Sequence, residues 1–390
     1  MATQRVAIGM MSGTSADGID AVAVRVAGSG PRMRAALVAH RHTPYAPALR
    51  RRLLAAMAPA ATTAAEVAQL DVLVGRAYGR VAAALLRQAR LGPRDVTLIA
   101  AHGQTLCHLP AQGATLQIGR SAEIAAATGV GVVSDFRSAD LAAGGEGAPL
   151  VPWTDWVLLR SPRRARAIQN VGGVANVTWL PAGGDVSDVR AFDTGPGNMV
   201  MDELVRTLTR GRRLYDARGA LAARGRVAPQ VLQDWLAHPF FSRRPPKSCG
   251  REQFGREFTE CWLRHYAGLR LSIADWLATA LALTVESIAS AYERFLPRRG
   301  PRGAPAIDEL ILCGGGAKNL ALRAALARRL PSLRVAPIEE YGIPAFAKEA
   351  LSFALLGLAC ADREPANLPR VTRARRRVVL GTLTPASEPP

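Results

Sequence analysis

The sequence predicts an α/β protein made of two similar halves, each of which opens with two strands joined by a glycine-rich turn. In the first half, the apolar runs 6–8 and 21–26 flank a turn that carries two aspartates. In the second half, the strand patterns 166–171 and 177–180 flank a turn with paired glycines. A recurring unit of this kind indicates a duplicated domain.

The first half continues with apolar patterns of strand and helix period. We expect strands at 34–41, 96–101, 115–118 and 130–134, and helices at 46–58, 63–91 and 121–127. Residues 141–152 are too rich in glycine and proline for regular structure, so they form a crossover loop. The first domain is therefore expected at 1–140 together with the C-terminal segment 362–390.

The second domain is expected at 141–361 and repeats the same alternation of patterns. After its opening hairpin, a strand-like segment at 191–193 precedes a short glycine and proline turn. We expect a strand at 309–313 and helices at 199–210, 228–237, 273–296, 320–329 and 349–361.

The composition excludes several classes of protein. The formal net charge is +19, but only three cations are lysine and the arginines are dispersed without interleaved aromatic residues. We therefore expect no nucleic-acid partner. The five cysteines show no metal-ligand spacing, and the N-terminus lacks the pattern of a signal peptide. We expect a cytoplasmic protein with no membrane partner.

The first turn, residues 9–20, is the strongest local signal. Its glycines, Ser12, Thr14 and Ser15 let an anion approach backbone N–H groups closely. Asp17 and Asp20 would repel that anion unless a divalent cation lay between them. Phosphates with a metal ion are the first interpretation, and a polar turn that only connects two strands is the alternative.

Two further glycine turns follow strands, Gly172-Gly173 and Gly314-Gly315-Gly316. The second could bring a nucleotide to a helix N-terminus. Neither is a Walker A loop, and no clean dinucleotide fingerprint occurs. Three such turns from two duplicated halves describe a clamp on a nucleotide between domains, as in the actin, Hsp70 and hexokinase-like ATPases.

Several polar residues follow strand patterns and are candidates for chemistry. Asp193 precedes a Gly-Pro-Gly turn, so it is either a base supported by a stiff strand or a turn aspartate. His102 could bind sugar hydroxyls or be a structural histidine. Asp135 and Arg137 follow another strand. Lys247 is one of the three lysines, which all lie in or beside motif-like segments.

Six segments resemble the signature of the anhydro-N-acetylmuramic acid kinase family. They occur in the family's order, at 9–20, 101–105, 170–176, 192–198, 245–252 and 313–319. The similarity runs from about residue 5 to 385. The sequence departs from the usual pattern at Ala16, Cys249 and Arg373, none of which removes a polar group with an assigned role.

The resemblance implies a fold of two duplicated ribonuclease H-like β/α domains of the actin/hexokinase/Hsp70 superfold, with ATP in the inter-domain cleft. It implies conversion of 1,6-anhydro-N-acetylmuramic acid, ATP and water to N-acetylmuramic acid 6-phosphate and ADP, in cell-wall recycling. Asp193 is then the catalytic base, Mg²⁺ accompanies ATP, and the protein is a homodimer.

The resemblance also assigns the remaining site residues. The expected nucleotide-binding residues are Gly13, Thr14, Ser15, Ala16, Asp17, Gly18, Ile19, Asp20, Gly172, Gly173, Gly195, Gly314, Gly315, Gly316 and Asn319. Asp17 and Asp20 would position Mg²⁺. The expected substrate residues are His102, Asp135, Arg137 and Glu349. Position alone suggests Glu340, Tyr341 and Glu349 as contacts of the lactyl or N-acetyl group.

Two other functions stay open from the sequence. A nucleotide-gated binding or chaperone module could use the same fold, although no substrate-binding domain follows in this chain. A conventional hexose kinase would use a free hydroxyl group as acceptor. A serine hydrolase is disfavoured, because no G-x-S-x-G motif occurs.

Overall fold

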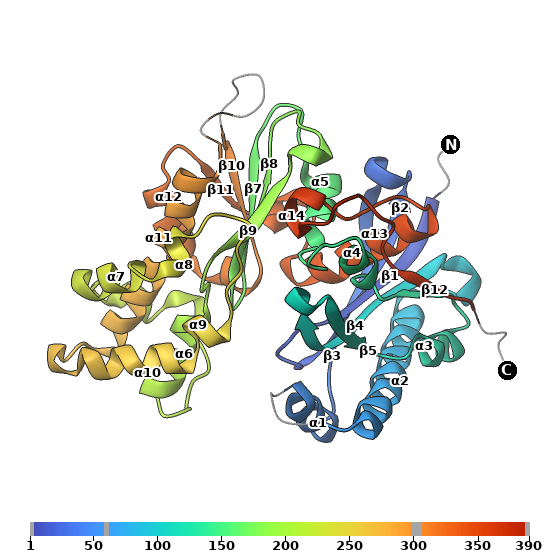
Figure 1. Ribbon diagram of the computed structural model, residues 1–390, viewed down its shortest axis with the longest axis horizontal. Coiled ribbons are helices and arrows are strands. Elements are labelled where there is room, and N and C mark those ends of the chain that lie inside the picture. The colour runs from blue at the N-terminus through green and yellow to red at the C-terminus, as the bar shows by residue number, and fades with distance from the viewer. Residues whose placement is uncertain (1–3, 58–61, 298, 300–305, 387–390) are drawn as a thin grey trace. The chain divides into compact units, whose positions relative to one another are not determined.

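The computed structural model describes residues 4–57, 62–297, 299 and 306–386 (Figure 1). Its contacts divide the chain into two compact units. Unit 1 comprises Met1–Leu158 and Gly342–Pro390, and unit 2 comprises Leu159–Tyr341. The chain thus passes from one unit to the other at different positions from the expected 140/141 and 361/362.

Unit 1 contains a mixed sheet with the strand order β12-β6-β4-β1-β2-β3, and β5 pairs with β4. The first three strands form an antiparallel meander, whereas β4 is parallel to β1 and β6 is parallel to β4. The strands are β1 (Gln4–Ser12), β2 (Gly18–Ala27), β3 (Arg34–Pro44), β4 (Leu98–Leu109), β5 (Ala114–Ile118), β6 (Val132–Ser134) and β12 (Thr382–Thr384).

Helices cover both faces of this sheet. Ile8 and Met10 of β1 share a core with α2, while Gly9, which points to the other face, lies against α13. A Cβ atom on Gly9 would stand 1.9 Å from the carbonyl oxygen of Ala350, so only glycine allows this approach. The helices are α1 (Pro47–Met57), α2 (Ala64–Ala89), α3 (Ser121–Thr128), α4 (Ser138–Ala142), α5 (Val151–Leu159), α13 (Lys348–Ala361) and α14 (Pro369–Thr372).

Unit 2 contains a sheet with the order β11-β10-β7-β8-β9. Its first three strands are again an antiparallel meander, and β10 and β11 are added in parallel beside β7. The two sheets therefore share one strand order, which confirms the duplication. The strands are β7 (Arg166–Val171), β8 (Ala175–Leu180), β9 (Arg190–Gly195), β10 (Glu309–Cys313) and β11 (Arg334–Pro337).

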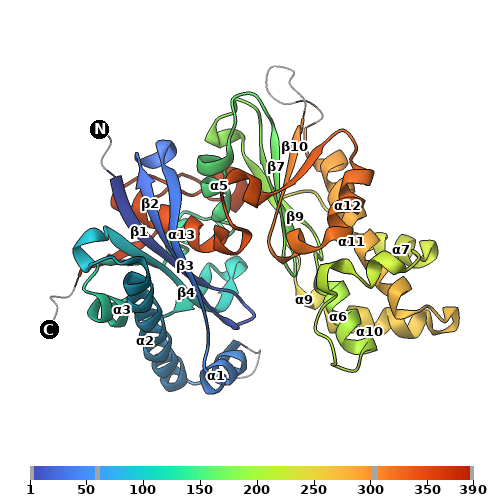
Figure 2. The ribbon, with the colours of Figure 1, turned by 180° about the vertical axis from the view of Figure 1, so that it is seen from behind.

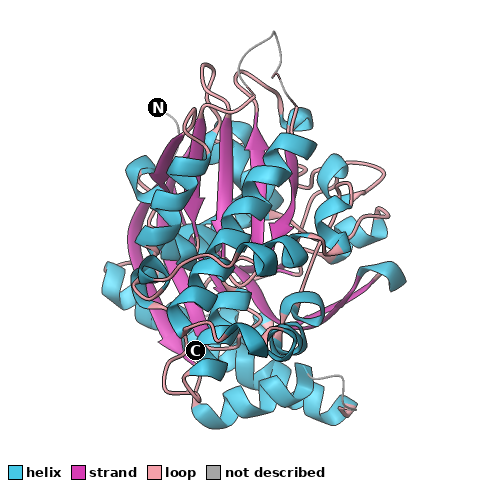
Figure 3. Ribbon diagram, turned by 90° about the vertical axis from the view of Figure 1, so that its left-hand side faces the viewer, coloured by secondary structure: helices cyan, strands magenta, loops and turns pink. Residues whose placement is uncertain are grey.

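The helices of unit 2 share one hydrophobic core with its sheet (Figures 2 and 3). The longest, α11, is long and apolar enough to cross a membrane by length and composition alone, and 67% of its apolar window is buried inside the structure. The helices are α6 (Met199–Leu208), α7 (Pro229–Leu236), α8 (Pro239–Ser242), α9 (Arg251–Phe254), α10 (Arg256–His265), α11 (Ile273–Phe295) and α12 (Leu320–Arg329).

Three expectations were wrong in detail. The strand expected at 96–101 continues to Leu109, because β5 pairs with its second half, so His102 lies inside β4 rather than after it. The crossover loop is shorter than expected, since α5 begins at Val151 and tolerates proline in its first turn. Helix α13, expected in the second domain, groups with unit 1, because it packs on β1.

Candidate active site

The first glycine turn, between β1 and β2, directs carbonyl groups toward the protein. The carbonyl oxygen of Gly13 accepts from Gln104 Nε2 at 3.1 Å, and that of Ser15 accepts from Arg50 at 3.3 Å. Within the described chain, no group accepts a hydrogen bond from the N–H of Thr14 or Ser15. The turn thus has the arrangement of an anion-binding concavity.

The two acids of this turn differ in their surroundings. Asp17 is exposed and accepts from the Ser15 hydroxyl group at 2.9 Å. Asp20 Oδ1 faces two histidines of β3, with His40 Nε2 at 3.2 Å and His42 Nδ1 at 3.1 Å. Sequence reasoning missed both histidines, because His42 lies beyond the strand expected at 34–41 and the contact with Asp20 depends on how β2 and β3 pair.

Three other residues of the first turn are held by packing. The side chains of Ala16 and Ile19 are buried in the core of unit 1. A Cβ atom on Gly18 would stand 2.6 Å from the carbonyl oxygen of Thr43. These positions shape the turn. The Ala16 N–H donates to the Gly13 carbonyl oxygen at 3.1 Å, and the Ala16 carbonyl oxygen accepts from Arg50 Nε at 3.0 Å.

The second glycine turn, between β7 and β8, is tied by the start of α6. The carbonyl oxygen of Gly172 accepts from Asn198 N–H at 2.8 Å, and that of Gly173 accepts from Met199 N–H at 3.1 Å. A Cβ atom on either glycine would find its nearest neighbour at 3.6 or 3.9 Å. This turn is therefore open on the side away from α6.

The third glycine turn follows β10 and is only partly open. Cβ atoms on Gly314 and Gly316 would stand 2.5 Å from Asn170 Oδ1 and from Val171 Cγ1, respectively. A Cβ atom on Gly315 would meet nothing within 4 Å. The outer glycines thus serve close packing against β7, and Gly315 alone offers free space.

Gly195 and Asn319 also have structural partners. A Cβ atom on Gly195 would stand 2.7 Å from Ser287 Oγ of α11. Asn319 is the N-cap of α12, and its Oδ1 accepts from Leu322 N–H at 3.0 Å. Both residues are explained by packing and capping without a ligand.

Asp193 lies on β9, beside the second glycine turn. Its N–H donates to the Lys247 carbonyl oxygen at 3.1 Å, and its Oδ2 accepts from Cys249 N–H at 3.0 Å. Burial raises the pKa of Asp193 to about 6, against the opposing effects of the Cys249 N–H and the Lys247 charge. A carboxylate oriented in this way, with a pKa near neutrality, is suited to general base catalysis.

His102, which is buried, and Arg137, which is half-buried, form a hydrogen-bonded pair in unit 1. His102 Nδ1 donates to the Gly103 carbonyl oxygen at 3.1 Å, so Nε2 accepts from Arg137 Nη2 at 2.9 Å. Burial and the Arg137 charge lower the pKa of His102 to about 3, which keeps the ring neutral. Burial lowers the pKa of Arg137 to about 10, so the guanidinium stays charged.

Arg137 lacks a carboxylate partner in the described part of the chain. Its Nε also donates to His102 Nε2 at 3.2 Å, and its Nη1 donates to the carbonyl oxygen of Gly147 at 2.7 Å. No acidic side chain lies within ion-pair distance, although Glu349 acts on it at longer range. A half-buried cation with neutral partners is suited to bind an anionic group.

The other two expected substrate residues lie in different settings. Asp135 is exposed and accepts from the Ser138 hydroxyl group at 2.7 Å, so its carboxylate caps the start of α4. Glu349 lies in the first turn of α13 and is exposed, yet it is surrounded closely enough that desolvation raises its pKa. The charged groups that act on it include Lys348, Asp20 and Arg137. We call His102, Arg137 and Glu349 the polar group of unit 1.

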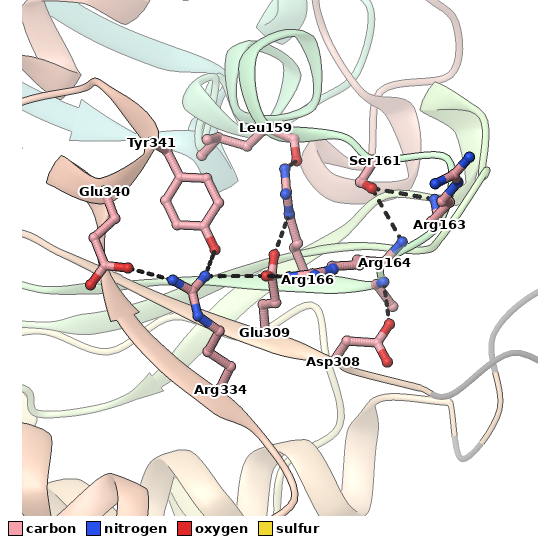
Figure 4. Close-up of polar contacts among 11 residues, drawn as sticks. Leu159, Ser161, Arg163, Arg164, Arg166, Asp308, Glu309, Arg334, Glu340 and Tyr341 are labelled. Carbon is pink, nitrogen blue, oxygen red and sulfur yellow. Dashed lines mark hydrogen bonds and ion pairs between the residues drawn. The ribbon is translucent and has the colours of Figure 1, made fainter.

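Glu340 and Tyr341 lie in a separate cluster, at the start of the unit 2 strands (Figure 4). Its centre is Glu309, which is buried and binds Arg164, Arg166 Nε at 2.8 Å and Arg334 Nη1 at 3.3 Å. Arg334 also contacts both residues. The expectation that they contact the substrate finds no support in this arrangement, which engages both in ion-pair packing.

The acids of the first turn fit Mg²⁺ only as an ion bound largely by phosphate. Among the described residues, no group of three or more His, Cys, Asp or Glu could hold a metal ion. Mg²⁺ on a nucleotide takes one or two carboxylates and completes its shell with phosphate oxygens and water. Asp17 and Asp20 are compatible with that donor set.

The chain matches the family model described as anhydro-N-acetylmuramic acid kinase over residues 5–386. Curated proteins with that name are similar along their whole length. The relative from Gloeobacter violaceus is 45% identical, with 97% of this chain and 98% of the relative covered. The relative from Caldanaerobacter subterraneus subsp. tengcongensis is 39% identical, with 98% and 97% covered.

Similarity to solved structures is much lower. An activator of the 2-hydroxyisocaproyl-CoA dehydratase from Clostridium difficile with bound ADPNP aligns with a TM-score of 0.43 at 14% identity, covering 93% of this chain and 96% of that one. A ROK family glucokinase from Streptomyces griseus aligns with a TM-score of 0.37 at 11% identity, covering 90% and 98%. The fold described above rests on the strand order itself and not on these likenesses.

Proposed function

The chain belongs to the anhydro-N-acetylmuramic acid kinase family, and we propose that it opens 1,6-anhydro-N-acetylmuramic acid with water while ATP phosphorylates O6. The products are N-acetylmuramic acid 6-phosphate and ADP. The observation that carries the proposal is Asp193, a partly buried carboxylate on a strand, oriented by Cys249 N–H and with a pKa raised toward neutrality.

The chemistry requires a base that acts on water. In the anhydro sugar O6 is bonded to C1, so there is no O6 hydroxyl group to deprotonate. Asp193 takes a proton from water as the water oxygen forms a bond to C1. The C1–O6 bond breaks, and O6 forms a bond to the γ-phosphorus as ADP leaves. Asp193 acts as the base of an inverting glycosidase does, with the phosphoryl group in place of the acid.

The glycine turns are proposed to hold the nucleotide phosphates. In unit 1, the N–H groups of Thr14 and Ser15 are available as donors. In unit 2, Gly172, Gly173 and Gly315 leave room for close approach. Mg²⁺, when bound, would neutralise phosphate charge, and Asp17 and Asp20 are the residues proposed to orient it. Phosphoryl transfer depends mainly on such positioning and electrostatics.

The sugar is proposed to bind the polar group of unit 1. Arg137 is the cation suited to the carboxylate of the lactyl group, because its own partners are neutral. His102 holds the guanidinium in place through an imidazole that stays neutral. Glu349 is suited to accept hydrogen bonds from sugar hydroxyl groups. Asp135 is the weakest member of the expected set, since its carboxylate is engaged by Ser138.

The same proposal includes a cytoplasmic role in cell-wall recycling, where the anhydro sugar arises, and a homodimeric state implied by the family. A single displacement at C1 predicts inversion, so the first product is the α-anomer. The alternative is a conventional hexose kinase. Such an enzyme would phosphorylate a sugar that already has a free O6 hydroxyl group, without opening an anhydro bond.

The test is ADP release in three parallel reactions, with the anhydro sugar, with N-acetylmuramic acid and with no sugar. We expect turnover with the anhydro sugar alone. Equal or faster turnover with N-acetylmuramic acid would indicate a conventional kinase. Release that does not depend on any sugar would indicate a nucleotide-gated module.

A further inference from the structure

Lys247 is a buried lysine that the reaction described above does not use. It is one of only three lysines in a chain with 50 basic residues. Its side chain is 6% exposed, and its ammonium lies 4.4 Å from the ring centre of Phe240 and 4.6 Å from that of Phe295. Its hydrogen bond goes to the Phe240 carbonyl oxygen at 3.2 Å.

No carboxylate of the described chain lies within ion-pair distance of this ammonium. Burial therefore lowers the pKa of Lys247 to about 8, a value at which it is still mainly protonated at neutral pH. The charged groups that act on it are Asp193 and the cations Arg294 of α11 and Arg243. Keeping a charge in this place costs stability, which makes the ammonium a candidate for a function.

The backbone of residues 247–249 makes two hydrogen bonds with Asp193, one with its N–H group and one with its carboxylate. Asp193 N–H donates to the Lys247 carbonyl oxygen at 3.1 Å, and Cys249 N–H donates to Asp193 Oδ2 at 3.0 Å. Residues 247–249 thus run along the end of β9. The aromatic rings around the ammonium fix the start of this segment, and the segment in turn fixes the carboxylate.

We propose that Lys247 is a positioning residue for Asp193: its backbone, hydrogen-bonded to Asp193, holds the ammonium where its charge keeps the carboxylate ionised. The proposal rests on the role of Asp193 as base given above. It gives the buried ammonium a function that is separate from binding the sugar or the nucleotide. The role is electrostatic, so the charge of the side chain matters more than its identity.

The sign of the expected pH effect follows from the charges. Burial raises the pKa of Asp193, and the Lys247 charge opposes this rise. Removing the charge therefore raises the pKa further, so the base is protonated over a wider acidic range. Above pH 8 Asp193 is ionised with or without Lys247. A loss confined to the acidic side is thus the signature of the electrostatic role.

The experiment is the pH profile of kcat for Lys247→Met, which keeps the length of the side chain and removes the charge. An opposite charge nearby lowers the pKa of a carboxyl by about one unit or more. We expect the acidic limb to move up by about one pH unit, with kcat about fivefold lower at pH 6 and changed less than about twofold at pH 8.5. Arg244→Met is the matched control, because it removes an exposed cation of the same segment that is not among the charges acting on Lys247, and it should leave the limb in place.

Lys247→Arg keeps the charge, so we expect its acidic limb to stay at the wild-type position even if kcat falls. An equal loss of activity at pH 6 and pH 8.5 in Lys247→Met, or a shifted limb in Lys247→Arg, would overturn the proposal. Asp193→Asn is measured alongside. Normal turnover in that variant would refute the role of Asp193, whereas an inactive Asp193→Asn with an unmoved Lys247→Met profile would refute the role of Lys247 alone.

Discussion

The first turns of the two units lie at the same place in the same strand order and differ in chemistry. In unit 1, the turn after β1 carries Thr14, Ser15 and Asp17; in unit 2, the turn after β7 carries two bare glycines. In both turns carbonyl groups are tied to the protein, by Arg50 and Gln104 or by the start of α6. The common scaffold thus fixes the carbonyl groups of both turns, and the two turns differ in their side chains.

The third strand of each meander also differs in the residues that it places beside the turn. Beside the first turn, β3 places His42 opposite Asp20, whereas beside the second turn β9 places Asp193 opposite Asn176. The acids of unit 1 sit next to hydroxyl groups and histidines, while the acid of unit 2 sits next to Lys247 and a backbone N–H. We propose metal and phosphate binding for the first set and proton transfer for the second.

Asp193→Asn is expected to have the largest effect on turnover, because it removes the proposed proton acceptor. The amide cannot accept the proton from water, so we expect turnover to fall by about 10²–10⁴, the usual contribution of a positioned base. Binding of a non-hydrolysable ATP analogue, measured by calorimetry, should stay within about threefold of wild type. Turnover near the wild-type rate would mean that another group is the base.

Asp20→Asn tests the other half of the division. We expect the Mg²⁺ concentration for half-maximal activity to rise by about 10–100-fold, as for other groups that support a bound metal. The acidic limb of the kcat profile should stay at the wild-type pH, because Asp193 is unchanged in this variant. An unchanged Mg²⁺ requirement in a titration would remove Asp20 from the metal side of the site.

The third glycine turn offers a matched pair of substitutions. Gly316→Ala places Cβ 2.5 Å from Val171 Cγ1 and should destabilise the protein by about 1–3 kcal/mol through overpacking. Gly315→Ala meets no atom within 4 Å and should leave the melting temperature unchanged while weakening nucleotide binding. Equal melting temperatures for the two variants in a thermal scan would contradict the packing assignment.

The buried carboxylate of Asp193 should also carry a cost in stability. Its pKa is higher in the folded protein than the ordinary value of 3.8, so the cost appears as the pH rises from about 4 and is fully present above pH 6. We therefore expect Asp193→Asn to be more stable than wild type by about 1–3 kcal/mol at pH 7.5, and by less at pH 5. Thermal unfolding at both pH values measures the difference, and a gain that is larger at pH 5 would have the wrong sign.

Much of the scaffold could be predicted from the sequence, because the strands and glycine turns are local patterns. The meanders, α2, α11 and the turn at 314–319 lie where apolar period and glycine placed them. The division of the chain into units could not be predicted as well. Whether α13 belongs to unit 1 or unit 2 depends on the contact of Gly9 with Ala350, residues far apart in the sequence.

The site was predictable in its residue types but not in its partners. Motifs pointed to Asp193, His102 and Arg137. The His102 ring that accepts from Arg137 is neutral because it is buried, and no local sequence pattern reveals that burial. His40 and His42 were missed, because their contact with Asp20 depends on the register of β2 with β3. Likewise, only the structure separates Gly315, which is open, from Gly314 and Gly316, which are packed.

The central claim is that Asp193 activates water for a single displacement at C1 of the anhydro sugar. The most direct test is NMR spectroscopy of the product within the first moments of turnover, before the anomers equilibrate. The account predicts that the α-anomer of N-acetylmuramic acid 6-phosphate appears first. The β-anomer as first product would contradict it.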